Sequence, residues 1–305
     1  MDARLIAAGL CFPEGPVALA DGSIPLVEIE RQTVSRVRPN GAVEVIARTG
    51  GGPNGMALGP DGALYVANNG GFAWRIEHGM LRPVLQPSDY TGGRIERVDI
   101  ATGETRVLYD RCDGHKLRGP NDIVFDGKGG FYFSDLGKTR PRDRDQGGLY
   151  YATADGSRIV EVAYPILTPN GVGLSPDGAT VYVAETETAR LWAFDLEAPG
   201  VARKQQFPSP HGGRLVIGLG GYQRFDSLAV DAAGNICVAT LISGCISVIA
   251  PDGTLIRQVP TGDPGTTNIC FGGPDRRTAY VTLSGKGQLI AMDWPEPGLR
   301  LAHEA

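Results

Sequence analysis

The 305-residue chain has no long apolar run, and this absence excludes a membrane-spanning helix. Such a helix needs at least about 18 consecutive apolar residues. The first ten residues, MDARLIAAGL, also lack the basic leader and the cleavage site of a secretion signal, so we expect them to form a first strand. We therefore expect no membrane partner, and the predicted location is the cytoplasm.

Familiar catalytic and nucleotide-binding motifs are missing as well. The absence of GxSxG, HExxH and P-loop patterns argues against a serine hydrolase, a zinc protease of that type or a nucleotide-binding enzyme. Charge of one sign is never clustered, because 29 basic and 34 acidic residues are mixed along the chain and give a net charge of −5. Since phosphate binding needs a clustered basic face, nucleic acid is not an expected partner.

Cysteine and helical patterns are scarce too. The five cysteines are odd in number and show no CxxC spacing, so they are expected to be free thiols or small buried side chains in a reducing compartment. What the chain has instead is 44 glycines, 22 prolines and short runs of alternating polarity that follow PDG or DGKGG turns. These runs predict strands and hairpins. Examples are ALYVAN (63–68), GFYFSD (130–135), TVYVAE (180–185) and TAYVTL (278–283).

Six segments place one polar residue just ahead of an apolar, strand-like run that ends at a turn. They read PEGPVALADG, PNGMALGPDG, PNDIVFDGKGG, PNGVGLSPDG, FDSLAVDAAGN and TNICFGGPDRR, and their polar residues are Glu14, Asn54, Asn121, Asn170, Asp226 and Asn268. Intervals of 40, 67, 49, 56 and 42 residues separate these positions. Repeats of this length that contain several strands predict an all-β fold, a six-bladed β-propeller of four-stranded antiparallel blades. Residues 1–305 are expected to form this propeller as a single domain.

The 67-residue interval holds an insertion at about residues 69–93, rich in glycine and aromatic residues. Long loops on a rigid scaffold usually carry function. We expect Phe72, Trp74 and Tyr90 to pack over the channel mouth or, alternatively, to form a small satellite core. The N-terminal RLIAAG is expected to close the ring by joining the sixth blade, beside LIAMDW and the final GLRLAH.

Equivalent positions of all blades face one central channel, so the six polar side chains are expected to converge. Glu14 and Asp226 offer carboxylates and the other four offer amide oxygens, a donor set that suits Ca²⁺ first, then Mg²⁺ or Mn²⁺, with Zn²⁺ as a further alternative. Two negative charges would neutralise one divalent cation, which could polarise a carbonyl or phosphoryl oxygen. Each Asn or Asp alone could instead cap a turn. The combined set favours a metal site, with Asn54 and Asn268 as pocket-lining substrate contacts.

The segments FPEGPV, GPNDIVFDGKGGFYFSD, PNGVGLSPDGATVYVAET and FDSLAVDAAGN resemble motifs of the gluconolactonase, regucalcin (senescence marker protein) and luciferin-regenerating enzyme family. The resemblance extends over nearly the whole chain. It implies six blades, one divalent cation in the channel and hydrolysis of sugar lactones; diisopropylfluorophosphatase is a relative. It also implies that Glu14, Asn170 and Asp226 are metal ligands, that Asn121 contacts metal or substrate, and that Asp226 is the general base.

One departure from the family concerns the substrate. Regucalcin-type members carry an Arg two residues before the Asn that matches Asn121, where it helps to bind sugar hydroxyls. Here that place is Gly119, and Arg118 lies one residue further back. The expected substrate is therefore either a sugar lactone or a less polar lactone or ester. Trp74 of the aromatic insertion would favour the less polar substrate as a binding contact. His115 and Arg118, close ahead of Asn121, are further predicted substrate contacts.

The predicted function is thus divalent-metal-dependent hydrolysis of a lactone, through a polarised carbonyl and an activated water. A phosphotriesterase, a lyase or an isomerase that uses the same site is one alternative. A propeller that binds calcium or another ligand without turnover is a second. The expected partner is a small-molecule substrate.

Overall fold

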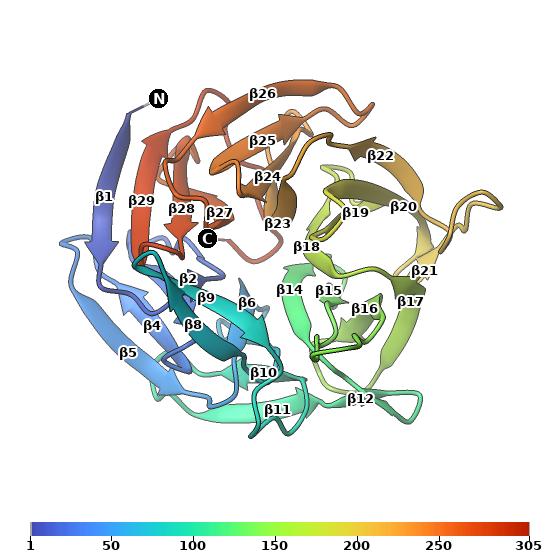
Figure 1. Ribbon diagram of the computed structural model, residues 1–305, viewed down its shortest axis with the longest axis horizontal. Coiled ribbons are helices and arrows are strands. Elements are labelled where there is room, and N and C mark those ends of the chain that lie inside the picture. Colours follow the sequence, from blue (N-terminus) through green and yellow to red (C-terminus); the bar gives the residue numbers. More distant parts are fainter. Residues whose placement is uncertain (1, 305) are drawn as a thin grey trace.

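The computed structural model describes residues 2–304, which form twenty-nine strands and no helix. Twenty-five of the strands make a ring of six sheets around a central axis, and the other four form two small hairpins (Figure 1). The predicted six-bladed propeller of four-stranded antiparallel blades is therefore confirmed. The described residues contain no helix with the length and apolar character that a membrane span requires.

Each blade begins at the axis and runs outward from its innermost strand. The first blade contains β2 (Pro13–Glu14), β3 (Ile24–Glu28), β4 (Thr33–Val37) and β5 (Val43–Arg48), and the second contains β6 (Pro53–Leu58), β7 (Leu64–Asn68), β10 (Arg94–Val98) and β11 (Thr105–Tyr109). The third contains β14 (Pro120–Phe125), β15 (Gly130–Asp135), β16 (Gly147–Thr153) and β17 (Ile159–Ile166). The fourth contains β18 (Pro169–Leu174), β19 (Thr180–Glu185) and β20 (Arg190–Ala198), the last of which pairs with both β21 (Val201–Ala202) and β22 (Arg214–Gly218). The fifth contains β23 (Arg224–Val230), β24 (Ile236–Leu241), β25 (Cys245–Ile249) and β26 (Leu255–Pro260).

The sixth blade combines both ends of the chain and closes the ring. It contains β27 (Thr266–Gly272), β28 (Thr278–Leu283), β29 (Gln288–Asp293) and the N-terminal β1 (Ala3–Ala8), which pairs antiparallel with β29. The expected closure by RLIAAG beside LIAMDW is confirmed. The final GLRLAH does not join this sheet, because β1 already occupies the free edge of β29. Its residues lie instead at the rear of the channel, where Leu299 and Leu301 line a small cavity.

The core consists of six apolar clusters, one between each pair of neighbouring blades. Successive side chains of a strand point to opposite faces of its sheet, so each blade contributes to two clusters. In β19, Val181 and Val183 pack toward the third blade, whereas Tyr182 and Ala184 pack toward the fifth. This explains why the second strand of each blade is almost continuously apolar.

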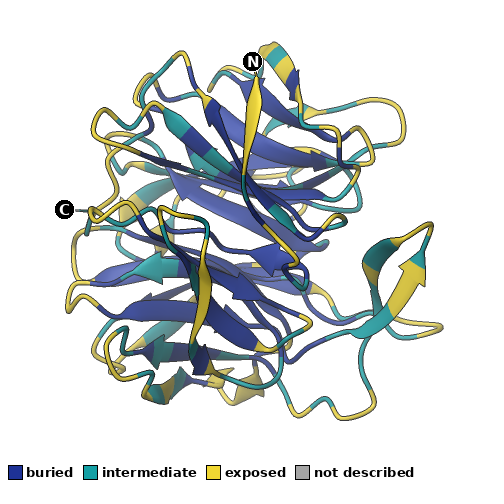
Figure 2. Cartoon of the chain, turned by 90° about the vertical axis from the view of Figure 1, so that its left-hand side faces the viewer, coloured by how far each residue is buried: buried dark blue, intermediate teal, exposed yellow. Residues whose placement is uncertain are grey.

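The expected insertion contains a regular hairpin, β8 (Ala73–Glu77) and β9 (Met80–Leu85), between β7 and β10. Figures 1 and 2 show that this hairpin stands on the front face of the ring, opposite to the C-terminus. A second small hairpin, β12 (Arg111–Cys112) and β13 (His115–Lys116), lies between the second and third blades. All five cysteines are free, as the sequence predicted.

The glycines that follow the polar residues let neighbouring inner strands approach closely. A Cβ atom on Gly55 would lie 2.3 Å from the carbonyl oxygen of Asn121, and one on Gly171 would lie 2.7 Å from that of Asp226. Both contacts involve backbone atoms, which cannot move aside without shifting a strand. The PNG motifs therefore contain glycine because of the crowded axis.

We predict that Gly171→Ala destabilises the fold by about 1–3 kcal/mol through overpacking against β23. Gly220→Ala is the matched control, because a Cβ atom there meets no atom within 4 Å and Gly220 is not among the positive-φ glycines. Denaturant titrations of both variants measure the difference. Equal free energies of unfolding for the two variants would contradict the close approach of the inner strands.

Candidate active site

The six polar residues singled out by the sequence occupy the innermost strands of the six blades. Their strands are β2, β6, β14, β18, β23 and β27. In all but the first of these, the register with the second strand shifts at or beside the polar residue, for example between Pro53 and Gly55 and between Pro169 and Val172. Such bulges turn a side chain away from its regular direction. In this propeller they occur beside the channel.

A cavity of about 450 Å³ lies on the hairpin side of the channel. Five of the six polar residues line it, and the sixth, Asn268, does not. The five are Glu14, Asn54, Asn121, Asn170 and Asp226. Four inner strands and the short β2 thus bring oxygen-bearing side chains from distant parts of the sequence to one place.

Glu14 is buried and fixed by hydrogen bonds. Its Oε2 accepts hydrogen bonds from the backbone N–H of Gly15 at 2.9 Å and from Nδ2 of Asn268 at 2.7 Å. Burial raises the pKa of Glu14 to about 7, although these hydrogen bonds act in the opposite direction. The carboxylate therefore lacks a positive partner among the described residues.

Asp226 and Asp122 add further acid groups to the same channel. Burial and the charge of Glu14 raise the pKa of Asp226 well above its ordinary value. Burial also raises the pKa of Asp122 to about 7, and its two oxygens accept hydrogen bonds from the backbone N–H groups of Ile123 and Val172 at 2.9 and 3.2 Å. Because the charge of Glu14 raises the pKa of Asp226 and both side chains line the same cavity, the two carboxyl groups lie in one electrostatic environment.

The two central asparagines differ in how they are held. Asn170 donates from Nδ2 to Thr186 Oγ1 at 3.0 Å, and Ser227 Oγ lies 3.4 Å from Asn170 Oδ1. Asn121 is buried, and its Oδ1 has no hydrogen-bond partner. Because buried polar atoms are nearly always paired, this oxygen indicates a missing electropositive partner.

These residues fit a hard divalent cation by their chemistry. The cavity combines two carboxylates and three amides, one of which, Asn121, has the unpartnered oxygen, and hard cations prefer oxygen ligands. Among the described residues, no group of three or more His, Cys, Asp or Glu is arranged to hold a metal. The expected set is not such a group, since it contains only two acids.

Four predicted substrate contacts lie elsewhere. Asn268 turns its side chain to Glu14 and lines the small cavity behind it, and Trp74 packs against Phe12 at 5.1 Å between ring centroids. His115 is exposed in the β12–β13 hairpin, because its segment forms a separate turn away from the axis. Arg118 is exposed too and does not line the cavity; its backbone N–H donates to Asp135 Oδ2 at 2.7 Å, and its carbonyl oxygen accepts from the hydroxyl of Tyr90 at 2.5 Å.

Other residues of the cavity did not stand out in the sequence. Thr186 and Thr267 line it beside the predicted set, and β9 supplies much of its wall. Thr186 immediately follows β19, the second strand of its blade, and this position is the only feature of the sequence that could have indicated its place in the cavity.

Lys138 is buried, and its Nζ donates to the carbonyl oxygen of Gly71 at 2.6 Å. It thereby ties the third blade to the insertion.

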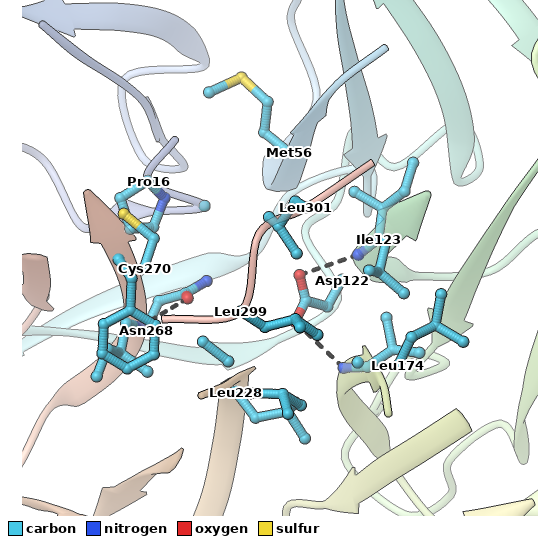
Figure 3. Close-up of a pocket in the computed structure, with 18 of the residues that line it drawn as sticks. Pro16, Met56, Asp122, Ile123, Leu174, Leu228, Asn268, Cys270, Leu299 and Leu301 are labelled. Carbon is cyan, nitrogen blue, oxygen red and sulfur yellow. Dashed lines mark hydrogen bonds between the residues drawn. The ribbon is translucent and has the colours of Figure 1, made fainter. Parts of the chain in front are cut away.

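The rear of the channel is closed. A second cavity of about 80 Å³ is lined by Asp122, Asn268 and apolar residues of the inner strands. Figure 3 shows Leu299 and Leu301 of the C-terminal segment beside Asp122 and Leu228. Of these two cavities along the channel, the one on the hairpin side is the one with room for a small-molecule substrate.

The fold and the site define a six-bladed propeller whose central cavity gathers acidic and amide side chains. The chain belongs to the SMP-30/gluconolactonase/LRE-like family, whose model matches residues 12–285. It is 26% identical to a gluconolactonase of Zymomonas mobilis, over 92% of this chain and 78% of that protein. The resemblance inferred from the motifs is therefore confirmed.

Solved structures show the same fold. A gluconolactonase of Xanthomonas campestris has a TM-score of 0.75 and 22% identity, over 96% of this chain and 89% of its own. A calcium-binding protein, regucalcin, of Agrobacterium tumefaciens has a TM-score of 0.75 and 20% identity, over 98% of both chains. At these identities the likeness establishes the architecture alone.

The buried acids predict how stability depends on pH when divalent cations are removed. Because the pKa of Glu14 and of Asp122 is raised to about 7, the folded chain holds protons that the unfolded chain has released. Their contribution to stability is complete below the ordinary carboxyl pKa and is lost as the pH rises through about 7. We expect the free energy of unfolding to fall between about pH 4 and 7, by up to about 1.4 kcal/mol per pH unit for each proton, and to level off at higher pH.

Denaturant titrations in chelator across this pH range measure the slope. Asp122→Asn should reduce the slope, because one of the titrating groups is then absent. A free energy of unfolding that rises steadily over the same range would contradict the raised pKa values.

Proposed function

We propose that the chain is a divalent-metal-dependent lactone hydrolase whose catalytic centre is the larger cavity. The observation that carries this proposal is the pair of acids, Glu14 and Asp226, in one cavity without a positive partner in the described part of the chain. A divalent cation would compensate both charges and would also satisfy the unpartnered Asn121 Oδ1. The activity named for the Zymomonas relative supports the choice of a lactone as substrate.

The proposed ligands are Glu14, Asn121, Asn170 and Asp226, with Ca²⁺ as the first candidate ion and Mg²⁺, Mn²⁺ or Zn²⁺ as alternatives. Asn268 orients the Glu14 carboxylate through its amide, and Thr186 fixes the amide of Asn170. Such supporting hydrogen bonds determine which oxygen is presented to the cavity. When bound, the cation supplies a Lewis acid that polarises the lactone carbonyl.

The residues of the chain then move the protons. Asp226 lies partly open to the cavity, and one of its carboxylate oxygens accepts a proton from the attacking water. The same group returns the proton to the ring oxygen as the acyl C–O bond breaks, which yields the hydroxy acid. Burial and the charge of Glu14 raise the pKa of Asp226, whereas a bound cation would lower it, so base action requires that one oxygen of Asp226 is not held by the cation. We assign substrate contact to Asn54, which lines the same cavity.

The first test measures hydrolysis of a lactone panel before chelation, after chelation and after return of each candidate cation. We expect turnover to disappear with the chelator and to recover with one cation. Turnover that is indifferent to chelation would overturn the metal requirement. Cation binding without hydrolysis of any lactone or phosphotriester would instead support a non-catalytic calcium-binding propeller.

The second test replaces the proposed base. Asp226→Asn should lower kcat by about 10²–10⁴, because the proton acceptor is lost while side-chain size is kept. Glu14→Gln should mainly weaken cation affinity, measured by calorimetry. Glu197→Gln is the control, since Glu197 is an exposed residue that pairs with Arg203 at 3.2 Å, outside the cavity lining. Retention of kcat by Asp226→Asn at saturating cation would refute its role.

A further inference from the structure

The cavity has a polar floor and apolar walls. The floor is formed by the five predicted donor residues at the ends of the inner strands. The walls come from the insertion and from loops that face it across the channel mouth. Their apolar residues are Phe12, Ile29, Phe72, Met80, Leu81, Pro83, Val84, Leu85, Leu136, Leu241, Ile242 and Pro264.

The two cationic side chains of the walls are already engaged. Arg82 pairs with Glu77 within the hairpin, and Arg224 pairs with Glu187 at 3.0 Å. Each pairing offsets the charge of one guanidinium and so weakens its attraction for a carboxylate or a phosphate on the substrate. Apart from the paired Arg82, the residues of β9 that line the cavity are all apolar.

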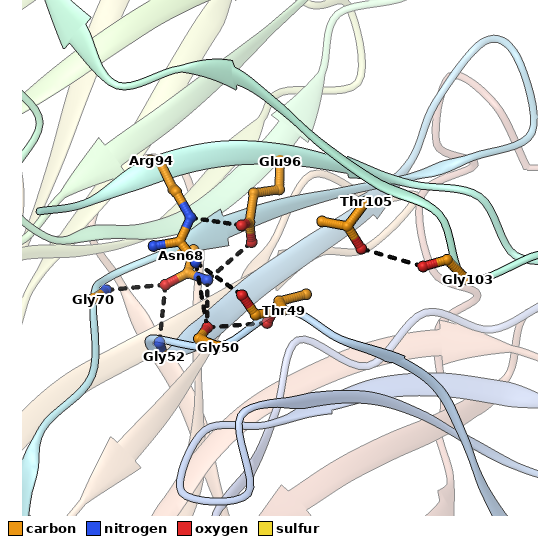
Figure 4. Close-up of polar contacts among 9 residues, drawn as sticks. All are labelled: Thr49, Gly50, Gly52, Asn68, Gly70, Arg94, Glu96, Gly103 and Thr105. Atoms are coloured by element: carbon orange, nitrogen blue, oxygen red, sulfur yellow. Dashed lines mark hydrogen bonds and ion pairs between the residues drawn. The ribbon is translucent and has the colours of Figure 1, made fainter. Parts of the chain in front are cut away.

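The hairpin is anchored where it leaves the second blade. Buried Asn68 accepts hydrogen bonds from the N–H groups of Gly52 and Gly70 at 2.9 and 3.0 Å and donates to Glu96 at 2.9 Å, as Figure 4 shows. Arg94, just after the insertion, donates to Glu96 Oε1 at 2.5 Å. Both ends of the insertion thus meet at one buried carboxylate.

Contacts with other blades hold the insertion over the mouth. Nζ of Lys138 donates to Gly71 and lies 4.2 Å from the ring centroid of Phe72. Trp74 packs between Phe72 and Phe12, with centroid distances of 5.9 and 5.1 Å. The third and first blades therefore fix the apolar wall before any ligand arrives, which reduces the entropy lost on binding.

We propose that the β8–β9 hairpin is a fixed apolar roof that selects lactones with an alkyl or aryl substituent over polyhydroxylated sugar lactones. This proposal rests on the function proposed above. An apolar substituent placed against the roof is removed from water, which is favourable. Sugar hydroxyls in the same place would lose hydrogen bonds to water without gaining partners. In both cases water adds to the carbonyl carbon, the acyl C–O bond breaks and the ring oxygen takes the proton.

The test compares two six-membered lactones on the full chain with its cation. We expect kcat/KM for δ-decalactone, which carries a pentyl group, to exceed that for δ-gluconolactone by at least about tenfold. Leu81→Asn should lower kcat/KM for δ-decalactone by about tenfold or more, mainly through KM, and change δ-gluconolactone little. Ile76→Asn is the matched control, because Ile76 lies in the same hairpin, is 74% exposed and does not line the cavity.

A binding measurement separates this proposal from the proposed function. The probe is 3-pentylcyclohexanone, in which a CH2 group replaces the ring oxygen of δ-decalactone so that it cannot be hydrolysed, and its affinity is measured by calorimetry. If no lactone is hydrolysed but the ketone binds and Leu81→Asn weakens its affinity, the proposed function is wrong, and the role of the hairpin in binding apolar substituents is supported. A preference for δ-gluconolactone, or ketone affinity that is unchanged in Leu81→Asn, overturns the roof.

Discussion

The arrangement of this molecule depends on the meeting of six inner strands at one axis. Their close approach leaves space for no Cβ atom at Gly55 or Gly171, and the adjoining bulges place polar side chains beside the channel. The cost is a concentration of acids, since Glu14 and Asp122 lie buried within reach of each other's charge. A positive charge in the cavity would relieve this repulsion and the cost of burial together.

The two ends of the channel differ, and the termini explain the difference. Because β1 takes the outer edge of the sixth blade, the C-terminal segment is left outside the sheet, and its Leu299 and Leu301 fill the rear of the channel. The hairpin side keeps a cavity of about 450 Å³. The C-terminal segment and the β8–β9 hairpin do not follow the repeat, and they make the two ends of the channel different: the larger cavity lies at the hairpin end.

The repeat explains which features could be predicted from the sequence. Glu14, Asn54, Asn121, Asn170 and Asp226 recur at equivalent positions, so their convergence follows from the blade pattern alone. Asn268 belongs to the same pattern, yet its amide turns to Glu14, a pairing between residues far apart in sequence that no local motif encodes. His115 and Arg118 precede Asn121 closely in sequence, yet neither lines the cavity: His115 lies in the separate β12–β13 hairpin, and the backbone of Arg118 bonds to Asp135 and Tyr90 while its side chain is exposed. The contact of Lys138 with the insertion could not be predicted, because a single lysine belongs to no repeated pattern in the sequence.

Chemistry and selectivity therefore have different structural origins. The floor of the cavity comes from strands that every blade must have, and changing one of them disturbs the packing of its neighbours at the axis. The walls come from an insertion between β7 and β10 that adds no strand to any blade. Its anchors, Asn68 and Lys138, lie at its base, and Leu81 of β9 packs against the apolar cluster between the first and second blades. The other cavity-lining residues of β9 lie outside the six apolar clusters and can vary at less cost to the ring, which makes this hairpin the part of the molecule best suited to determine which substrate reaches the floor.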